Sequence, residues 1–170
     1  MATPLFINRT DLVRNSIIDG NVDTNKFLYF ISMAQTIHIQ QFLGTELYEE
    51  FEGMITAGTL TELLNPNHYT LMTEYIQPML IWYAQVDYIP FASYSIKNSG
   101  VTKHRSENSE PATKEELDYL VAKAREFAEW YSRRFVDYMN FNQNLFPKYY
   151  SNSDDDIYPS QDATFNGWVL

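Results

Sequence analysis

The segment Met79 to Ala84 constrains the fold most, because its residues are apolar on every side of a helix. A helix without a polar face is normally buried at the centre of a protein. Around this segment, apolar residues recur at helical spacing from Tyr69 to Ser95, which predicts a long central helix. We expect Ile76, Leu80 and Tyr83 on this helix to be buried.

Start and stop signals predict further helices on both sides of the central one. The first is expected from about Thr24 to Leu43, the second from Thr45 as its capping residue to Ala57, and the last from the capping box Thr113–Glu116 to about Asn142. Gly44 separates the first two, and Pro78 is expected to kink or break the central helix because proline lacks an amide donor. The sequence therefore predicts an all-α fold, a small helical bundle.

Two parts of the chain lack helical periodicity. The polar residues 96–112 are expected to form one extended loop. Residues 151–170 are acidic and are expected to form an extended C-terminal arm beside a helical domain of residues 1–150. Large side chains on this arm are its expected anchors: Tyr158, Phe165 and Trp168. We expect the arm to lie on a neighbouring protein, the competing view being that it folds back on its own subunit.

The last helix carries a second apolar stripe besides its main face. Tyr119, Trp130 and Phe141 are spaced by eleven residues. At about 100° per residue, eleven residues leave only ~20° of drift, so the three rings line up along the helix. Two interpretations stay open: another subunit covers the stripe, or the arm or a helix of the same subunit covers it.

The chain is acidic, with a formal net charge of −10, and it contains no cysteine. Proteins that wrap DNA neutralise phosphates with Lys and Arg, so this balance disfavours wrapping but lets DNA pass without sticking. One basic island, with Lys97, Lys103 and Arg105, interrupts the acidic character. We hypothesise that these three residues face DNA or an acidic partner.

Motifs for catalysis and cofactor binding are missing from the sequence. None of the three histidines has a glutamate three residues before it, and no zinc-protease motif, glycine-rich phosphate loop or nucleophile elbow is present. The run Asn152–Asp156 resembles a calcium loop, but Ile157 replaces its required glycine. No apolar run approaches the roughly 20 residues of a membrane span. We therefore expect no enzyme, catalytic residue, cofactor, metal or membrane partner.

A succession of packing motifs runs along the chain: Ala34-Gln35, Leu43-Gly44-Thr45, Leu47-Tyr48, Pro78, Tyr83, Gly100-Val101 and Phe146-Pro147. This succession resembles the head-to-tail connector proteins of tailed bacteriophages, and it looks most like the neck or adaptor ring proteins of crAss-like phages. The resemblance covers about residues 10–150. The acidic arm is not part of this pattern.

The resemblance implies a structural virion protein at the head–tail junction, assembled in the host cytoplasm. It implies copies of the subunit, about twelve, in a closed ring through which the genome passes. The implied partners are the portal protein and other neck or tail proteins. The alternative is an acidic helical binding protein or nucleic-acid mimic acting on a host protein. A mimic is expected to cluster its carboxylates on one surface, whereas here they spread from Asp11 to Asp162.

Overall fold

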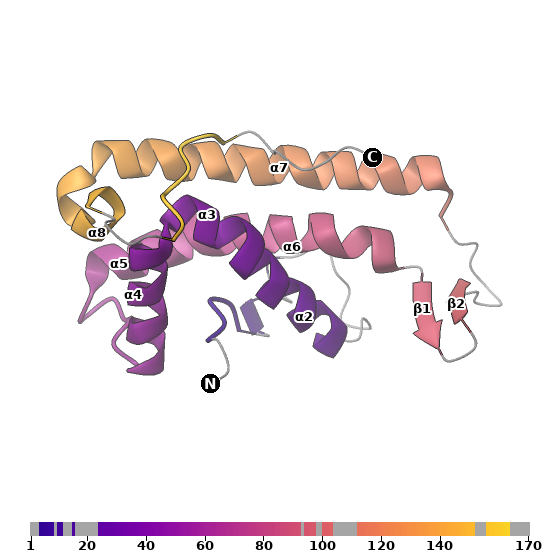
Figure 1. Ribbon diagram of the computed structural model, residues 1–170, viewed down its shortest axis with the longest axis horizontal. Helices are drawn as coiled ribbons and strands as arrows, with labels where there is room; N and C mark the ends of the chain where they lie inside the picture. The colour runs from indigo at the N-terminus through magenta and orange to yellow at the C-terminus, as the bar shows by residue number, and fades with distance from the viewer. Residues whose placement is uncertain are drawn as a thin grey trace.

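The computed structural model describes residues 4–8, 10, 11, 15, 24–92, 94–97, 100–103, 112–151 and 156–163. Within these ranges the chain is a small all-α bundle, as predicted, with one added pair of short strands (Figure 1). Its helical elements are, in chain order, α2 (Thr24–Ala34), η1 (Gln35–Ile39), α3 (Gln40–Leu43), α4 (Thr45–Thr56), α5 (Pro66–Leu71), η2 (Met72–Ile76), α6 (Gln77–Ala92), α7 (Lys114–Phe141), η3 (Gln143–Leu145) and α8 (Pro147–Tyr150). The turns η1 and η2 are π-helical, and η3 is a 3-10 turn.

The helix α6 lies at the centre of the bundle, between α2 and the long helix α7 (Figure 1). Its apolar residues face neighbours on both sides, so they pack against α2 and α7 together. The predicted burial of Ile76, Leu80 and Tyr83 is confirmed. A helix with apolar side chains all round can be stable only in such a position, because any other would expose one of its faces to water.

The disturbance expected at Pro78 takes the form of the π-helical turn η2, and the helical run from Pro66 to Ala92 is not interrupted. Proline has no amide to donate to the carbonyl oxygen of Glu74, four residues earlier. The Nη1 of Arg134 in α7 donates to that oxygen instead, at 2.9 Å. The same guanidinium lies 4.4 Å from the ring centre of Tyr75. A side chain of α7 therefore supplies the hydrogen bond that Pro78 cannot make at the start of α6.

The sharp turn at Gly44 joins α3 to α4 and also holds the tail. Gly44 has a φ of 72°, a conformation that glycine adopts without steric cost. The prediction that Thr45 caps α4 is wrong, because Thr45 is the first helical residue and makes no capping bond. Its hydroxyl donates to Asp156 Oδ2 at 3.0 Å and accepts from the amide of Ile157 at 3.1 Å. Thr45, which the sequence predicts to cap its own helix, thus bonds a segment 111 positions later in the chain.

The region between α6 and α7 differs from the predicted loop at its start. Strand β1 (Tyr94–Lys97) pairs antiparallel with β2 (Gly100–Lys103) and forms a short hairpin beyond the end of α6 (Figure 1). The capping box predicted before α7 is confirmed. The hydroxyl of Thr113 accepts from the amide of Glu116, and the Glu116 carboxylate accepts from the amide of Thr113.

Candidate functional site

The outer face of α7 is the strongest candidate for a functional surface. Tyr119, Trp130 and Phe141 are 62%, 54% and 89% exposed, respectively. We call these three residues the outer stripe. The helix forms one long edge of the molecule and packs against α6 with its opposite side (Figure 1). The eleven-residue spacing therefore does what the sequence predicts and places three large rings on a face that the described chain leaves open.

A second row of partly exposed aromatic side chains lies closer to α6. Phe127 contacts Trp82 of α6 with ring centres 4.7 Å apart, and Trp130 contacts Tyr131 edge-on at 4.8 Å. Leu120 and Phe127 are both more than a third exposed. Apolar side chains therefore also lie between the packed side of α7 and the outer stripe.

The polar residues beside the outer stripe are solvated. Lys123 lies between Tyr119 and Trp130 in sequence, and its ammonium group contacts the Glu126 carboxylate at 2.7 Å. The hydrogen bond and charge of Glu126 raise the pKa of Lys123. Exposed pairs of this kind contribute little to stability, because water competes for both charges. Near the start of α7, Tyr119 and Leu120 also line a shallow hollow of about 610 Å³ together with Glu115 and Glu116.

The described part of the C-terminal arm, residues 156–163, is extended and packs on its own chain. Asp156 and Ile157 bond Thr45, as described above. In addition, the amide of Ser160 donates to the carbonyl oxygen of Gln41 at 2.7 Å. Pro159 is buried, whereas the predicted anchor Tyr158 is exposed. Phe165 and Trp168 lie outside the described residues. Residues 156–163 thus contact their own chain, and the contact of the arm with a neighbouring protein stays a prediction.

The competing view of the arm is correct in one respect only. Residues 156–163 fold back on their own subunit, but they do not cover the outer stripe. They run beside a different part of α7, where Gln161 and Ala163 line a hollow of about 410 Å³ with Glu129, Arg133 and Asp137 (Figure 1). The described arm thus leaves the three rings of the stripe available to another molecule.

The basic island predicted to meet DNA falls partly on the hairpin. Lys97 is the last residue of β1 and stands opposite Gly100, and Lys103 is the last residue of β2 and stands opposite Tyr94. The two lysines therefore belong to opposite ends of the pairing. Arg105 lies outside the described residues. The structure places this island at the far end of α6, away from α4 and α8 (Figure 1).

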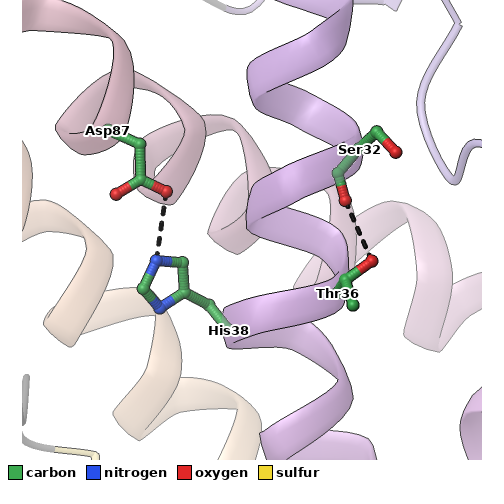
Figure 2. A network of polar contacts seen from close by, with 4 residues as sticks. All are labelled: Ser32, Thr36, His38 and Asp87. Carbon is green, nitrogen blue, oxygen red and sulfur yellow. Dashed lines mark hydrogen bonds and ion pairs between the residues drawn. The ribbon is translucent and has the colours of Figure 1, made fainter.

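A partly buried aromatic and polar cluster between η1 and α6 could not be predicted from the sequence. His38 Nε2 lies 3.1 Å from Asp87 Oδ2, so the η1 turn is tied to α6 (Figure 2). The imidazole stacks on Tyr83 at 4.4 Å, and the Tyr83 hydroxyl lies 3.0 Å from Ser132 Oγ in α7. Burial raises the pKa of Tyr83. The hydroxyl of Ser132 thus contacts Tyr83 and not His38. Ser132 and His38 therefore do not form a pair of nucleophile and general base.

Other charged clusters in the described residues are also structural in character. Glu50 contacts His68 at 3.5 Å and Lys148 at 3.6 Å, which links α4 to α5 and α8. Within the part of the chain that the structure describes, no three histidine or carboxylate side chains gather where they could hold a metal ion. No helix in that part is long and apolar enough to cross a membrane.

The fold and the outer stripe define a class, a small helical bundle that leaves an aromatic helix face open. The model of a protein family described as "Family of unknown function (DUF6712)" matches residues 39–157, and the chain belongs to this family. The matched region extends from η1 to Ile157, which bonds Thr45, so it includes α6, α7 and the contact of the arm. Neither the curated proteins nor the solved structures contain a match to the chain.

Proposed function

We propose that this chain is a structural virion protein that forms a head-to-tail connector ring between portal and tail, through which the phage genome passes. The observation that carries the proposal is the outer stripe, in which three large aromatic side chains are exposed along one helix face. The resemblance to phage connector proteins, carried by the packing motifs given above, supplies the kind of assembly.

Exposed aromatic side chains do not stabilise an isolated subunit, but they can stabilise an interface with another protein. Large apolar groups forgo favourable burial when they face water, and exposed apolar surface on soluble proteins often marks an interaction site. Tyr, Trp and Phe are enriched in the contacts that dominate protein–protein binding. The outer stripe therefore fits a surface that a neighbouring subunit covers.

A ring also requires a second, different contact surface on each subunit, because its contacts run head to tail. Exposed apolar side chains occur at two further places on the subunit. Leu63 and Leu64 are 90% and 60% exposed in the turn before α5, and Tyr29 and Phe91 are exposed where α2 and α6 lie side by side. None of these residues belongs to α7. The chain thus presents separate apolar surfaces, as a head-to-tail contact needs.

The charge of the chain is compatible with passage of DNA. A net charge of −10 repels phosphate, so DNA moving through a ring would not be retained by its wall. The partners in this proposal are copies of the chain, the portal protein and other neck or tail proteins. The hairpin lysines Lys97 and Lys103, with Arg105, would meet DNA or an acidic neighbouring ring.

Gold-labelled antibody against the chain, applied to purified phage particles, tests the proposal directly. Label at the junction of head and tail supports it. Label elsewhere on the particle, or none, contradicts it. Recovery of the chain only from host cytoplasm, bound to a host enzyme that acts on nucleic acid, would favour the alternative of an acidic binding protein or nucleic-acid mimic.

A further inference from the structure

The N-terminal residues Pro4 to Ile7 are inserted into the bundle, although α2 begins only at Thr24. Phe6 and Ile7 are buried as completely as the central residues of α6. The ring of Phe6 lies 5.1 Å from that of Tyr48 and 6.0 Å from that of Phe51, both in α4. The segment is therefore held like a bound peptide, with two apolar side chains in the core.

Two glutamine side chains bind the backbone of this segment. Gln35 Oε1 accepts from the amide of Phe6 at 2.9 Å, and Gln35 Nε2 donates to the carbonyl oxygen of Pro4 at 3.0 Å. Gln77 Nε2 donates to the carbonyl oxygen of Phe6 at 2.8 Å. Bonds to the main chain give affinity for an extended peptide, while pockets for side chains give specificity.

The four residues Gln35, Tyr48, Phe51 and Gln77 form what we call the N-terminal docking site. Gln35 is fully buried, and its Nε2 also donates to the Tyr48 hydroxyl at 3.0 Å. Without a bound segment its Oε1 would lose the bond to Phe6, and a buried polar atom without a partner is costly. Gln35 begins one π-helical turn and Gln77 follows the other. Such turns occur frequently at functional sites.

Nothing in these contacts depends on the segment belonging to the same chain. The bonded residues are 29 to 71 positions apart in sequence, so local chain geometry does not dictate their pairing. The stretch between Ile7 and Thr24 can span at most roughly 50–60 Å if its helical residues, which include Thr10, Asp11 and Asn15, unwind. The axis of α7 is about 42 Å long at 1.5 Å per residue. The unwound stretch is therefore longer than the longest helix of the described bundle, which is long enough for exchange with an adjacent copy.

We propose that the N-terminal docking site binds residues 4–7 of a second copy of this chain, so that adjacent subunits exchange these segments. The exchange rests on the proposed assembly of copies, but the binding of the segment as a separate peptide does not. The ligand class is an extended peptide with adjacent aromatic and aliphatic side chains, represented here by Pro4-Leu5-Phe6-Ile7.

Binding is tested with a chain that lacks residues 1–8 and a dye-labelled synthetic peptide of residues 2–9. Saturable binding is expected, and Phe6→Ala in the peptide should weaken it at least about tenfold. Gln77→Ala in the protein should also weaken binding about tenfold, because the carbonyl oxygen of Phe6 loses its donor. Gln143→Ala, at an exposed position on η3, serves as the matched control and should leave affinity unchanged.

A second acceptor guards against misfolding of the shortened chain. The full chain with Phe6→Ala keeps its own segment but binds it more weakly, so the peptide of residues 2–9 should displace it. Failure of the peptide to bind either acceptor, with circular dichroism showing folded helices, would overturn the docking site as a peptide-binding site.

Exchange itself is tested by mixing two assembly-defective full chains. One carries Phe6→Asp and Ile7→Asp and keeps its docking site, and the other carries Gln35→Ala and Gln77→Ala and keeps its segment. Each variant alone should stay a single subunit, whereas the mixture, measured by light scattering, should form pairs of about twice the subunit mass if segments are exchanged, because the intact segment of one chain fills the intact docking site of the other. Peptide binding without such pairs would show that the segment acts within its own subunit. Disruption of the outer stripe that leaves assembly intact would instead overturn the proposed function while leaving the docking site standing.

Discussion

The helix α6 and the outer face of α7 are both rich in aromatic and aliphatic side chains, but only α6 is covered by its own chain. The residues of α6 between Met79 and Val86 are buried, apart from half-buried Trp82, whereas the outer stripe is largely exposed. Both regions were apparent in the sequence as apolar patterns. The difference is that α6 is apolar all round, while the stripe of α7 stands apart from the face that packs.

This contrast separates what folds the subunit from what the subunit offers to others. Buried apolar area stabilises the chain by roughly 25 cal/mol per Å². The apolar side chains of α6 contribute this stabilisation within the bundle, because the other helices of the chain cover them. The outer stripe contributes little to the isolated chain, because its rings remain in water. Substitutions should therefore affect stability in α6 and association in the stripe.

The largest expected effect is on stability, from Leu80→Ala in α6. Removal of a buried leucine side chain leaves a cavity and should lower the free energy of unfolding by about 2–5 kcal/mol. The matched substitution Tyr119→Ala in the outer stripe should change it by less than about 0.5 kcal/mol. Urea unfolding of both variants measures the difference. Similar losses in the two variants would show that the stripe is part of the core.

The turn at Gly44 tests whether the arm belongs to the covered part of the molecule. Gly44 and Gly58 both have positive φ, at 72° and 68°, so alanine is strained at either position. A Cβ at Gly44 would also lie 2.6 Å from Pro159 Cγ, whereas one at Gly58 meets nothing within 4 Å. Gly44→Ala should therefore cost about 1–3 kcal/mol more than Gly58→Ala in thermal or urea unfolding.

Deletion of residues 151–170 completes this test. If the arm packs as described, the shortened chain should lose most of the difference between Gly44→Ala and Gly58→Ala, because Pro159 is gone. It should also melt at a lower temperature than the full chain, since Thr45 loses its partners Asp156 and Ile157. Unchanged melting after the deletion would mean that residues 156–163 do not stabilise their own subunit.

A smaller effect is expected where the two helices join at Arg134. Arg134→Met keeps an apolar stem but leaves the carbonyl oxygen of Glu74 without its donor, and should cost about 1 kcal/mol. The neighbouring Arg133→Met, at an exposed position, should stay within about 0.5 kcal/mol of wild type. With Pro78→Ala as background, the amide of residue 78 becomes available, and the cost of Arg134→Met should shrink. An undiminished cost would rule out the proline as the cause.

Those features that depend on local chemistry could be predicted from the sequence. The apolar run at Met79 predicted the central helix, Gly44 the end of α3, and Thr113 with Glu116 the capping box of α7. The outer stripe was also found, because eleven-residue spacing fixes direction on any helix. Each of these needs only neighbours within a few turns of chain.

Features that join distant segments could not be predicted in this way. Thr45 has the residue type of a cap, but its hydroxyl meets Asp156, 111 positions later. The pair of His38 and Asp87 spans 49 positions, and Gln35 and Gln77 carry no pattern that marks them as hydrogen-bond partners of Phe6. Such contacts depend on how helices pack, and hydrophobic periodicity says which face is buried but not what it meets.

The central claim is that the outer stripe joins copies of this chain, and light-scattering mass with electron microscopy of the purified full chain tests it most directly. The account predicts closed assemblies larger than one subunit, which the double variant Trp130→Glu, Phe141→Glu reduces to single subunits that keep the helix content of wild type by circular dichroism. Asn140→Glu adds a charge beside Phe141 without removing a ring and should still assemble. A full chain that stays monomeric, or a double variant that assembles as before, would contradict the claim.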